Sequence, residues 1–123
     1  MGYRVLMVED EPINRKVLEQ MLDNIDCDYD VAEIGTKAVK LALSRPYDII
    51  LLDIQLPDFS GISVTEQLRD AGIDIPIIAT TAHTFLDEKL SFIAAGMNDV
   101  LGKPFRQQQL SKMMDKWLKH DIK

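Results

Sequence analysis

The sequence contains only one cysteine, Cys27, among its 123 residues, so no disulfide can form within the chain. A chain without disulfides is typical of a reducing compartment, and we expect a cytoplasmic protein. Cys27 itself is expected to be a small apolar filler or a loop residue. A chain of this length can bury one hydrophobic core without a disulfide or a structural metal. We therefore expect a single domain over residues 1–123 and no further domain in this chain.

Basic residues are also scarce. The 14 lysines and arginines are outnumbered by 20 acidic residues, which gives a net charge of −6. A nucleic-acid-binding surface needs clustered Lys and Arg, so direct binding of nucleic acid is not expected. No apolar stretch approaches the ~18 residues of a membrane span, and no charged-then-apolar signal segment precedes Val5. We therefore expect no insertion into a membrane.

What the sequence does contain is a regular alternation of short apolar runs with segments of helical periodicity. Uninterrupted apolar runs are typical of parallel strands that are buried on both faces. The alternation predicts an α/β fold, in which a parallel sheet of five strands carries helices on both faces. The strands are predicted at Arg4–Val8, Tyr29–Ala32, Ile49–Asp53, Pro76–Thr80 and Asp99–Leu101.

Two of the intervening helices have clear signals in the sequence. After Pro12, apolar residues recur at helical spacing and predict one buried helix face. These residues are Ile13, Val17, Leu18, Met21, Leu22 and Ile25. The second helix is predicted to run to about Ser44, with the side chain of Thr36 capping its first turn.

Polar side chains collect where the predicted strands end. Glu9 and Asp10 follow the first strand, and Asp53 ends the third. Thr81 lies at the end of the fourth strand, and Lys103 comes just after the fifth. Taken singly, each is an ordinary surface residue. In open parallel sheets, however, ligands bind beyond the carboxyl ends of the strands, so these side chains are expected to converge on one edge.

This set of side chains suits phosphoryl chemistry. Three carboxylates in one cleft repel one another unless a cation neutralises them. Carboxylate oxygens select a hard ion, and Mg²⁺ held by a few carboxylates and water fits this description. Asp53 could then act as a nucleophile and form an aspartyl phosphate. Lys103 and the hydroxyl of Thr81 could contact the phosphoryl oxygens.

Four segments of the sequence resemble the receiver domains of bacterial response regulators, in the same order and at similar spacing. They are residues 8–12 (VEDEP), 51–57 (LLDIQLP), 75–82 (IPIIATTA) and 102–105 (GKPF). The resemblance extends over essentially the whole chain. It implies a flavodoxin-like, doubly wound (βα)5 fold with five parallel strands in the order 2-1-3-4-5. It also implies a phosphorylation-dependent switch in a two-component phosphorelay rather than an enzyme in its own right.

The resemblance further implies a role for each residue at the strand ends. Asp53 would accept a phosphoryl group from the phosphohistidine of a histidine kinase or a histidine phosphotransfer protein. A Mg²⁺ or Mn²⁺ ion would be held by Glu9, Asp10, Asp53 and the backbone carbonyl of Gln55. Thr81 and Lys103 would contact the phosphoryl group, and the peptide bond between Lys103 and Pro104 would be cis. The only catalysis implied is of the domain's own phosphorylation and dephosphorylation.

Other positions bear on the lifetime of the phosphoryl group and on its readout. Gln55 and His83 occupy positions that, in the family, flank the route of the attacking water. Val100 stands where the family often has a Tyr or Phe that moves together with Thr81, so an aromatic switch is excluded here. The readout is expected at the fourth helix, fifth strand and fifth helix, where a phosphorylation-dependent dimer could form. Residues 11–15 look like those of receivers attached to hybrid sensor kinases.

Three other interpretations are set against this one. A phosphohydrolase of the haloacid dehalogenase type also uses an Asp nucleophile and Mg²⁺, but it needs a second Asp where this chain has Gln55. A flavodoxin-like electron carrier needs a small, polar first loop, whereas residues 9–11 (EDE) would repel a flavin phosphate. A degenerate receiver that only binds proteins would lack the acceptor, the acids or the lysine, and all of these are present.

Overall fold

The computed structural model describes residues 2–82 and 85–118, and its strands and helices alternate as the sequence predicts. The five strands form one parallel sheet in the order β2-β1-β3-β4-β5, which confirms the α/β fold and the strand order. The strands are β1 (Arg4–Val8), β2 (Asp28–Ala32), β3 (Ile49–Asp53), β4 (Ile77–Thr81) and β5 (Asp99–Gly102). The helices are α1 (Pro12–Asp23), α2 (Gly35–Ser44), α3 (Gly61–Asp70), α4 (Leu86–Ala94) and α5 (Gln107–Leu118).

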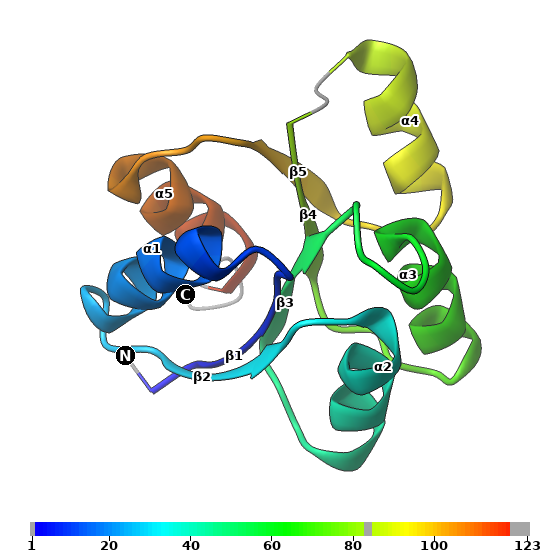
Figure 1. Cartoon of the computed structure of the whole chain (residues 1–123), viewed down its shortest axis with the longest axis horizontal. Helices are drawn as coiled ribbons and strands as arrows, with labels where there is room; N and C mark the ends of the chain where they lie inside the picture. Colours follow the sequence, from blue (N-terminus) through cyan, green and yellow to red (C-terminus); the bar gives the residue numbers. More distant parts are fainter. Residues whose placement is uncertain (1, 83–84, 119–123) are drawn as a thin grey trace.

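The sheet is the middle layer of three (Figure 1). Helices α1 and α5 cover one face, and α2, α3 and α4 cover the other. Because successive residues of a strand point to opposite faces, the central strand β3 contributes to two hydrophobic cores. Ile50 and Leu52 pack toward α2, α3 and α4, whereas Ile49 and Leu51 pack toward α1 and α5. All five residues of β3 are buried, as the apolar run predicts.

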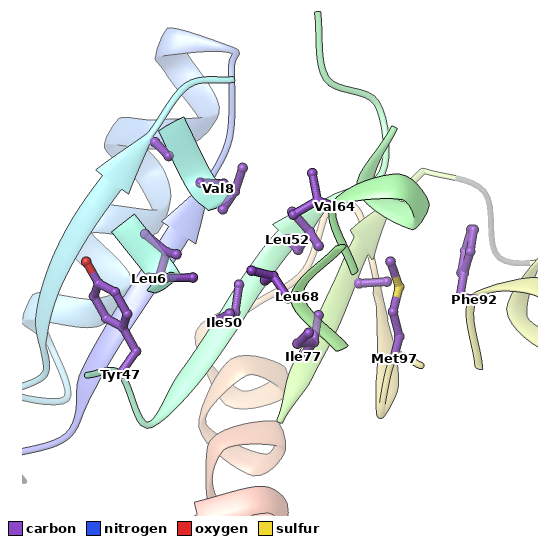
Figure 2. Packing of buried hydrophobic residues seen from close by; sticks show 14 residues of the cluster. Leu6, Val8, Tyr47, Ile50, Leu52, Val64, Leu68, Ile77, Phe92 and Met97 are labelled. Carbon is purple, nitrogen blue, oxygen red and sulfur yellow. The ribbon is translucent and has the colours of Figure 1, made fainter. Parts of the chain in front are cut away.

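Figure 2 shows the core between the sheet and helices α2, α3 and α4, where Val64 and Leu68 of α3 lie against β3. The opposite core contains Cys27, which is 7% exposed. Its predicted role as a small apolar filler is therefore confirmed. Burial also raises the pKa of the Cys27 thiol, which keeps it in the unreactive protonated form.

The predicted buried face of α1 is only partly correct. Leu18 and Leu22 are buried, but Ile13 is 71% exposed and Val17 is 50% exposed. Helix α1 begins directly after the loop at the carboxyl edge of the sheet, so its first turns border a groove at that edge instead of lying on the strands. Two apolar side chains are therefore left at the surface beside the candidate site.

The predicted cap of α2 is wrong. The helix begins at Gly35, and Ile34, at the capping position, makes no side-chain hydrogen bond to it. The carboxylate of Asp58 accepts hydrogen bonds from the backbone N–H groups of Gly35 and Thr36 and from the Thr36 hydroxyl. Thr36 is thus a donor to the cap rather than the cap itself, because a residue 22 positions away in sequence supplies the acceptor.

Helix α4 is anchored by few buried side chains. Only Phe92 of this helix is buried, whereas Leu86, Leu90 and Ile93 are between 47% and 68% exposed. Within the part of the chain that the structure describes, no helix has the length and apolar character to span a bilayer.

Candidate functional site

The carboxyl ends of the four strands β1, β3, β4 and β5 bring the expected side chains together. In the parallel register, Asp53 of β3 lies opposite Thr80 of β4, and Thr81 lies opposite Gly102 of β5. The backbone N–H of Lys103 donates to the carbonyl of Thr81 at 2.7 Å. This hydrogen bond holds Lys103 beside the end of β4. The topology alone therefore places an acid, a hydroxyl and a lysine at adjacent strand ends.

Lys103 joins the two buried acids of the site. Its ammonium nitrogen Nζ lies 2.8 Å from Oε1 of Glu9 and 3.2 Å from Oδ2 of Asp53. Glu9 and Asp53 are only 2% and 5% exposed. The peptide bond between Lys103 and Pro104 is cis, as the resemblance implies. The two buried carboxylates thus share one cation, and this pairing offsets part of the free-energy cost of burying their charges.

The environment shifts the pKa of both Asp53 and Lys103. Burial raises the pKa of Asp53 to about 6, against the opposing effects of the Gln55 N–H and Lys103. Burial alone would lower the pKa of Lys103, but the carboxylates of Glu9 and Asp53 outweigh it and raise the pKa. Lys103 is therefore a permanent cation, and Asp53 is an acid that burial pushes toward neutrality.

Glu9, Asp10 and Asp53 have the chemistry of a divalent-cation site. Each can offer one carboxylate oxygen, and these oxygens lie within 4.8 Å of one another. Asp10 is exposed, whereas the other two acids are buried, so the cluster extends from the interior to the surface. All-oxygen ligation with room for water suits Mg²⁺ and also Mn²⁺. The residues present thus fit the ion that the sequence predicts.

Two contacts that sequence reasoning missed hold the acidic loop after β1. The guanidinium of Arg15 donates to the backbone carbonyls of Asp10 at 2.7 Å and of Glu9 at 3.3 Å. The carboxylate of Glu11 caps α1 by accepting from the N–H groups of Ile13 and Asn14. An acid just before Pro12 at a helix start was a usable signal for the cap, but nothing in the sequence indicated where Arg15 would reach.

The loop after β3 folds back closely over Asp53. The N–H of Gln55 donates to Oδ1 of Asp53 at 3.0 Å. The N–H of Gly61 donates to the carbonyl of Ile54 at 2.8 Å, and a Cβ atom at Gly61 would lie 2.6 Å from the carbonyl oxygen of Asp53. Only glycine fits there without displacing the backbone of the acid, so Gly61 sets the shape of this part of the site.

The remaining predicted residues are placed less directly. Thr81 is buried at the end of β4, next to the site. Val100 is half-buried and packs against the core shared with α2, α3 and α4. His83 lies outside the described residues, so its predicted influence on the phosphoryl lifetime stays a prediction.

A groove of about 370 Å³ opens beside the site. Helix α1 lines one wall with Asn14, Val17, Leu18 and Met21, and residues 103–105 line the other. Glu9, one of the acids of the site, and Thr80 also line the groove. The groove is thus mostly apolar and leads to the buried carboxylates.

Comparison with known proteins gives a consistent result. A family model described as the response regulator receiver domain matches residues 5–115. The chain is 39% identical to two-component system protein A of Emericella nidulans over 116 residues, covering 92% of this chain and 17% of that protein. It is 32% identical to the sensor histidine kinase GacS of Pseudomonas protegens over 119 residues, covering 93% of this chain and 13% of GacS. The chain therefore spans less than a fifth of the length of either relative.

Solved structures show the same similarity. The receiver domain of the sensor histidine kinase PA1611 from Pseudomonas aeruginosa, described with magnesium in its active-site cleft, is 36% identical with a TM-score of 0.89. That match covers 97% of this chain and 99% of the other. A chain from the co-crystal structure of the Saccharomyces cerevisiae phosphotransfer protein Ypd1 and the Ssk1 receiver domain is 31% identical with a TM-score of 0.89. It covers 94% of this chain and 88% of its own length.

Proposed function

Because this chain belongs to the response regulator receiver domain family, we propose that it is a phosphorylation-dependent switch whose phosphoacceptor is Asp53. One observation carries the proposal: the buried Asp53 carboxylate shares the cation of Lys103 with Glu9 at the carboxyl edge of the sheet. A carboxylate held in this way has a fixed orientation and a neighbouring positive charge for the oxygens of an incoming phosphoryl group.

The proposed reaction is transfer from a phosphohistidine to Asp53. A carboxylate oxygen of Asp53 forms a bond to phosphorus while the bond from phosphorus to the imidazole nitrogen breaks, and the electron pair of that bond stays on the imidazole. Lys103 pairs with one phosphoryl oxygen, and the hydroxyl of Thr81 donates to another. Burial raises the pKa of Asp53, and the neighbouring cation of Lys103 opposes this shift by favouring the reactive carboxylate form.

A divalent ion is proposed to be held by Glu9, Asp10, Asp53 and the carbonyl of Gln55. When bound, it neutralises charge that develops on the phosphoryl oxygens. The chain's own part is to keep the acids at the sheet edge, which the contacts of Arg15 and Lys103 do. Phosphorylation and later dephosphorylation of Asp53 are the only catalysis that we propose for the domain.

The phosphodonor is proposed to be a histidine kinase or a histidine phosphotransfer protein. The apolar groove beside Glu9 and the exposed side chains of Ile13 and Val17 together offer a surface on which a donor helix could pack. The yeast Ypd1–Ssk1 structure is a complex of a phosphotransfer protein with a receiver domain, which supports this class of partner.

The readout is proposed at the surface formed by α4, β5 and α5. Phosphorylation adds about one further negative charge and strong acceptor oxygens beside Thr81, at the end of the strand that leads toward α4. Helix α4, with one buried side chain and an apolar exposed face, is the element that can shift at low cost. With valine at position 100, the shift does not involve an aromatic side chain at that position. A dimer that forms on phosphorylation would use the same surface.

The proposal is tested by phosphotransfer profiling. A panel of phosphorylated histidine kinases and phosphotransfer proteins is mixed with the chain, with Mg²⁺ present or chelated, and transfer of label is followed over time. We expect transfer from at least one donor with Mg²⁺ and almost none with chelator. Sustained hydrolysis of simple phosphate esters would instead support a phosphohydrolase, and acquisition of no label from any donor or acyl phosphate would support a degenerate receiver.

A further inference from the structure

The loop that connects β3 to α3 is fastened at its far end to another helix. Asp58 accepts hydrogen bonds from the N–H of Gly35 to Oδ1 at 2.7 Å and from the N–H of Thr36 to Oδ2 at 2.9 Å. The hydroxyl of Thr36 donates to the same Oδ2 atom at 2.7 Å. One exposed carboxylate thus accepts three hydrogen bonds from the first two residues of α2, which lie 23 and 22 positions earlier in the sequence.

These bonds replace a cap that α2 lacks in its own sequence. The first N–H groups of a helix need acceptors, and a negative charge near them also interacts favourably with the helix dipole. Desolvation raises the pKa of Asp58, but the hydrogen bonds from Thr36, Gly35 and Phe59 outweigh it and hold the pKa well below its usual range. The carboxylate therefore stays ionised and engaged with α2 over the whole neutral range of pH.

The neighbouring residue strengthens the same attachment. A Cβ atom at Gly35 would lie 2.6 Å from the ring carbon Cε2 of Phe59, so the ring rests directly on the glycine. Phe59 also packs against the core between the sheet and α2, α3 and α4. Two consecutive loop residues, one polar and one aromatic, thus bind the start of α2.

The near end of the loop is fixed at the candidate site. The N–H of Ile54 donates to the carbonyl of Thr80 at 3.2 Å, and the N–H of Gln55 donates to Asp53. Between these contacts and Asp58 lie only Leu56 and Pro57, and proline has a fixed φ angle. So short a span leaves the peptide group of Gln55 little freedom while both ends are held.

We propose that Asp58 is a positioning residue for the divalent-cation site: by fastening the loop to α2, it holds the backbone carbonyl of Gln55 where it can act as a metal ligand. This inference rests on the proposed function, because it takes Gln55 to be a ligand. Ligands are held in geometry by the groups that bind them from behind, and loss of such a group commonly weakens metal affinity. The start of α2 is thereby coupled to the state of the metal site.

The test compares Mg²⁺ affinity, measured by calorimetry, among the wild type, Asp58→Ala and Thr36→Val. Asp58→Ala removes the attachment and is expected to weaken Mg²⁺ binding roughly tenfold. Thr36→Val removes only the hydroxyl donor, so we expect it to weaken Mg²⁺ binding less than Asp58→Ala does. If Asp58→Ala does not fold, Thr36→Val provides the test in its place. The control is Asp30→Ala, which removes a half-buried carboxylate of the edge strand β2 that accepts hydrogen bonds from Tyr47 and Arg45. It is expected to leave Mg²⁺ affinity unchanged even where it lowers stability.

A second measurement separates positioning from general stability. In NMR titrations of the wild type with Mg²⁺, the backbone amide signals of Gly35 and Thr36 should shift with the same midpoint as that of Gln55, and Asp58→Ala should abolish the shifts at Gly35 and Thr36. If the wild type binds Mg²⁺ and folded Asp58→Ala and Thr36→Val bind it equally tightly, the positioning role is wrong while the proposed function stands. If the wild type itself binds no divalent ion, the metal site of the proposed function is wrong.

Discussion

Asp53 combines two properties that oppose each other in the folded chain. Its side chain is buried, which disfavours its charge, yet the proposed chemistry requires the charged form. Burial raises its pKa to about 6, compared with about 3.9 for an unfolded chain. Between about pH 4 and pH 6 the folded state therefore binds more protons than the unfolded state, so this group makes stability fall as pH rises through that window.

The first prediction follows from the direction in which stability changes with pH. In the absence of divalent ions, Asp53→Asn should raise the free energy of unfolding at pH 7.5 by about 1–3 kcal/mol, since two pKa units correspond to about 2.7 kcal/mol. The gain should shrink toward zero as the pH falls below about 4, because the wild-type acid then becomes protonated in the unfolded as well as in the folded state. Urea unfolding monitored by circular dichroism at several pH values measures this difference.

Asp99 provides the matched contrast. Burial raises its pKa, but hydrogen bonds from Lys116, Trp117 and the Val100 N–H outweigh this and lower the pKa. Its stabilising contribution is therefore present above the unfolded pKa and lost as pH falls, so Asp99→Asn should destabilise the chain at pH 7.5. If both substitutions destabilised the chain equally at pH 7.5, burial would not disfavour the charged form of Asp53.

At the residue scale, the sequence predicted the acids and the lysine well because each lies at the end of a strand or just after it. Their convergence needs only a parallel sheet, which the apolar runs indicated. Arg15 and Asp58 were not predicted, because their partners are backbone groups of other loops. Tertiary packing decides which carbonyl or N–H group a charged side chain contacts. Spacing in the sequence does not predict such contacts.

Among the elements, the end of α3 shows how one side chain can join several loops. The guanidinium of Arg69 donates to the carbonyls of Gly96, Ile73 and Ile75 at 2.9 Å each. It also donates to Oδ1 of Asn98 at 2.8 Å. The C-terminal end of α4 is thus held to α3 and to the start of β4, so a shift of α4 on phosphorylation would be largest at its N-terminal end, nearest the site.

The second prediction tests whether this network depends on the shape of the guanidinium. Arg69→Lys keeps the charge but offers one point donor group in place of a planar fork, so it cannot reach four acceptors on two loops. Loss of several hydrogen bonds to half-buried carbonyls should lower the free energy of unfolding by about 2–4 kcal/mol. Denaturant unfolding measures the change, and a Lys variant as stable as the wild type would show that charge alone suffices.

The start of α1 at Pro12 and the end of α2 at Ser44 agree with the sequence signals, but the groups that cap the helix starts were not all predicted. Glu11 caps α1 and Ser60 caps α3 from within their own segments. The cap of α2 comes from a distant loop, so the nearby Thr36 was a misleading signal. The exposed first turns of α1 have a similar cause, since helical periodicity marks an apolar face but does not say whether strands or a groove lie against it.

At the scale of the whole molecule, the order of the strands determines which side chains meet at the carboxyl edge of the sheet. Alternating strands and helices predicted an α/β sheet, but the order 2-1-3-4-5 came from resemblance to a family, because periodicity does not specify which strands are neighbours. That order places β3 at the centre, between β1 and β4. The acid of β3 thereby lies between the acids after β1 and the hydroxyl of β4.

The third prediction links metal binding to the stability of the whole fold. Because a divalent ion should bind the folded chain and not the unfolded one, Mg²⁺ at a hundred times its Kd should stabilise the fold by about 2.7 kcal/mol. Thermal unfolding at constant ionic strength, with and without Mg²⁺, measures the shift in Tm. Asp10→Asn, which removes an exposed ligand, should reduce the shift, and an unchanged Tm in the wild type would contradict a metal site at Glu9, Asp10 and Asp53.

The central claim is that Asp53 accepts the phosphoryl group. The most direct test is the intact mass of the wild type and of Asp53→Asn after incubation with a small acyl phosphate and Mg²⁺. We predict that the wild type gains the mass of one phosphoryl group and that Asp53→Asn, still folded by circular dichroism, gains none. Uptake by Asp53→Asn equal to that of the wild type would place the phosphoryl group on another residue and contradict the account.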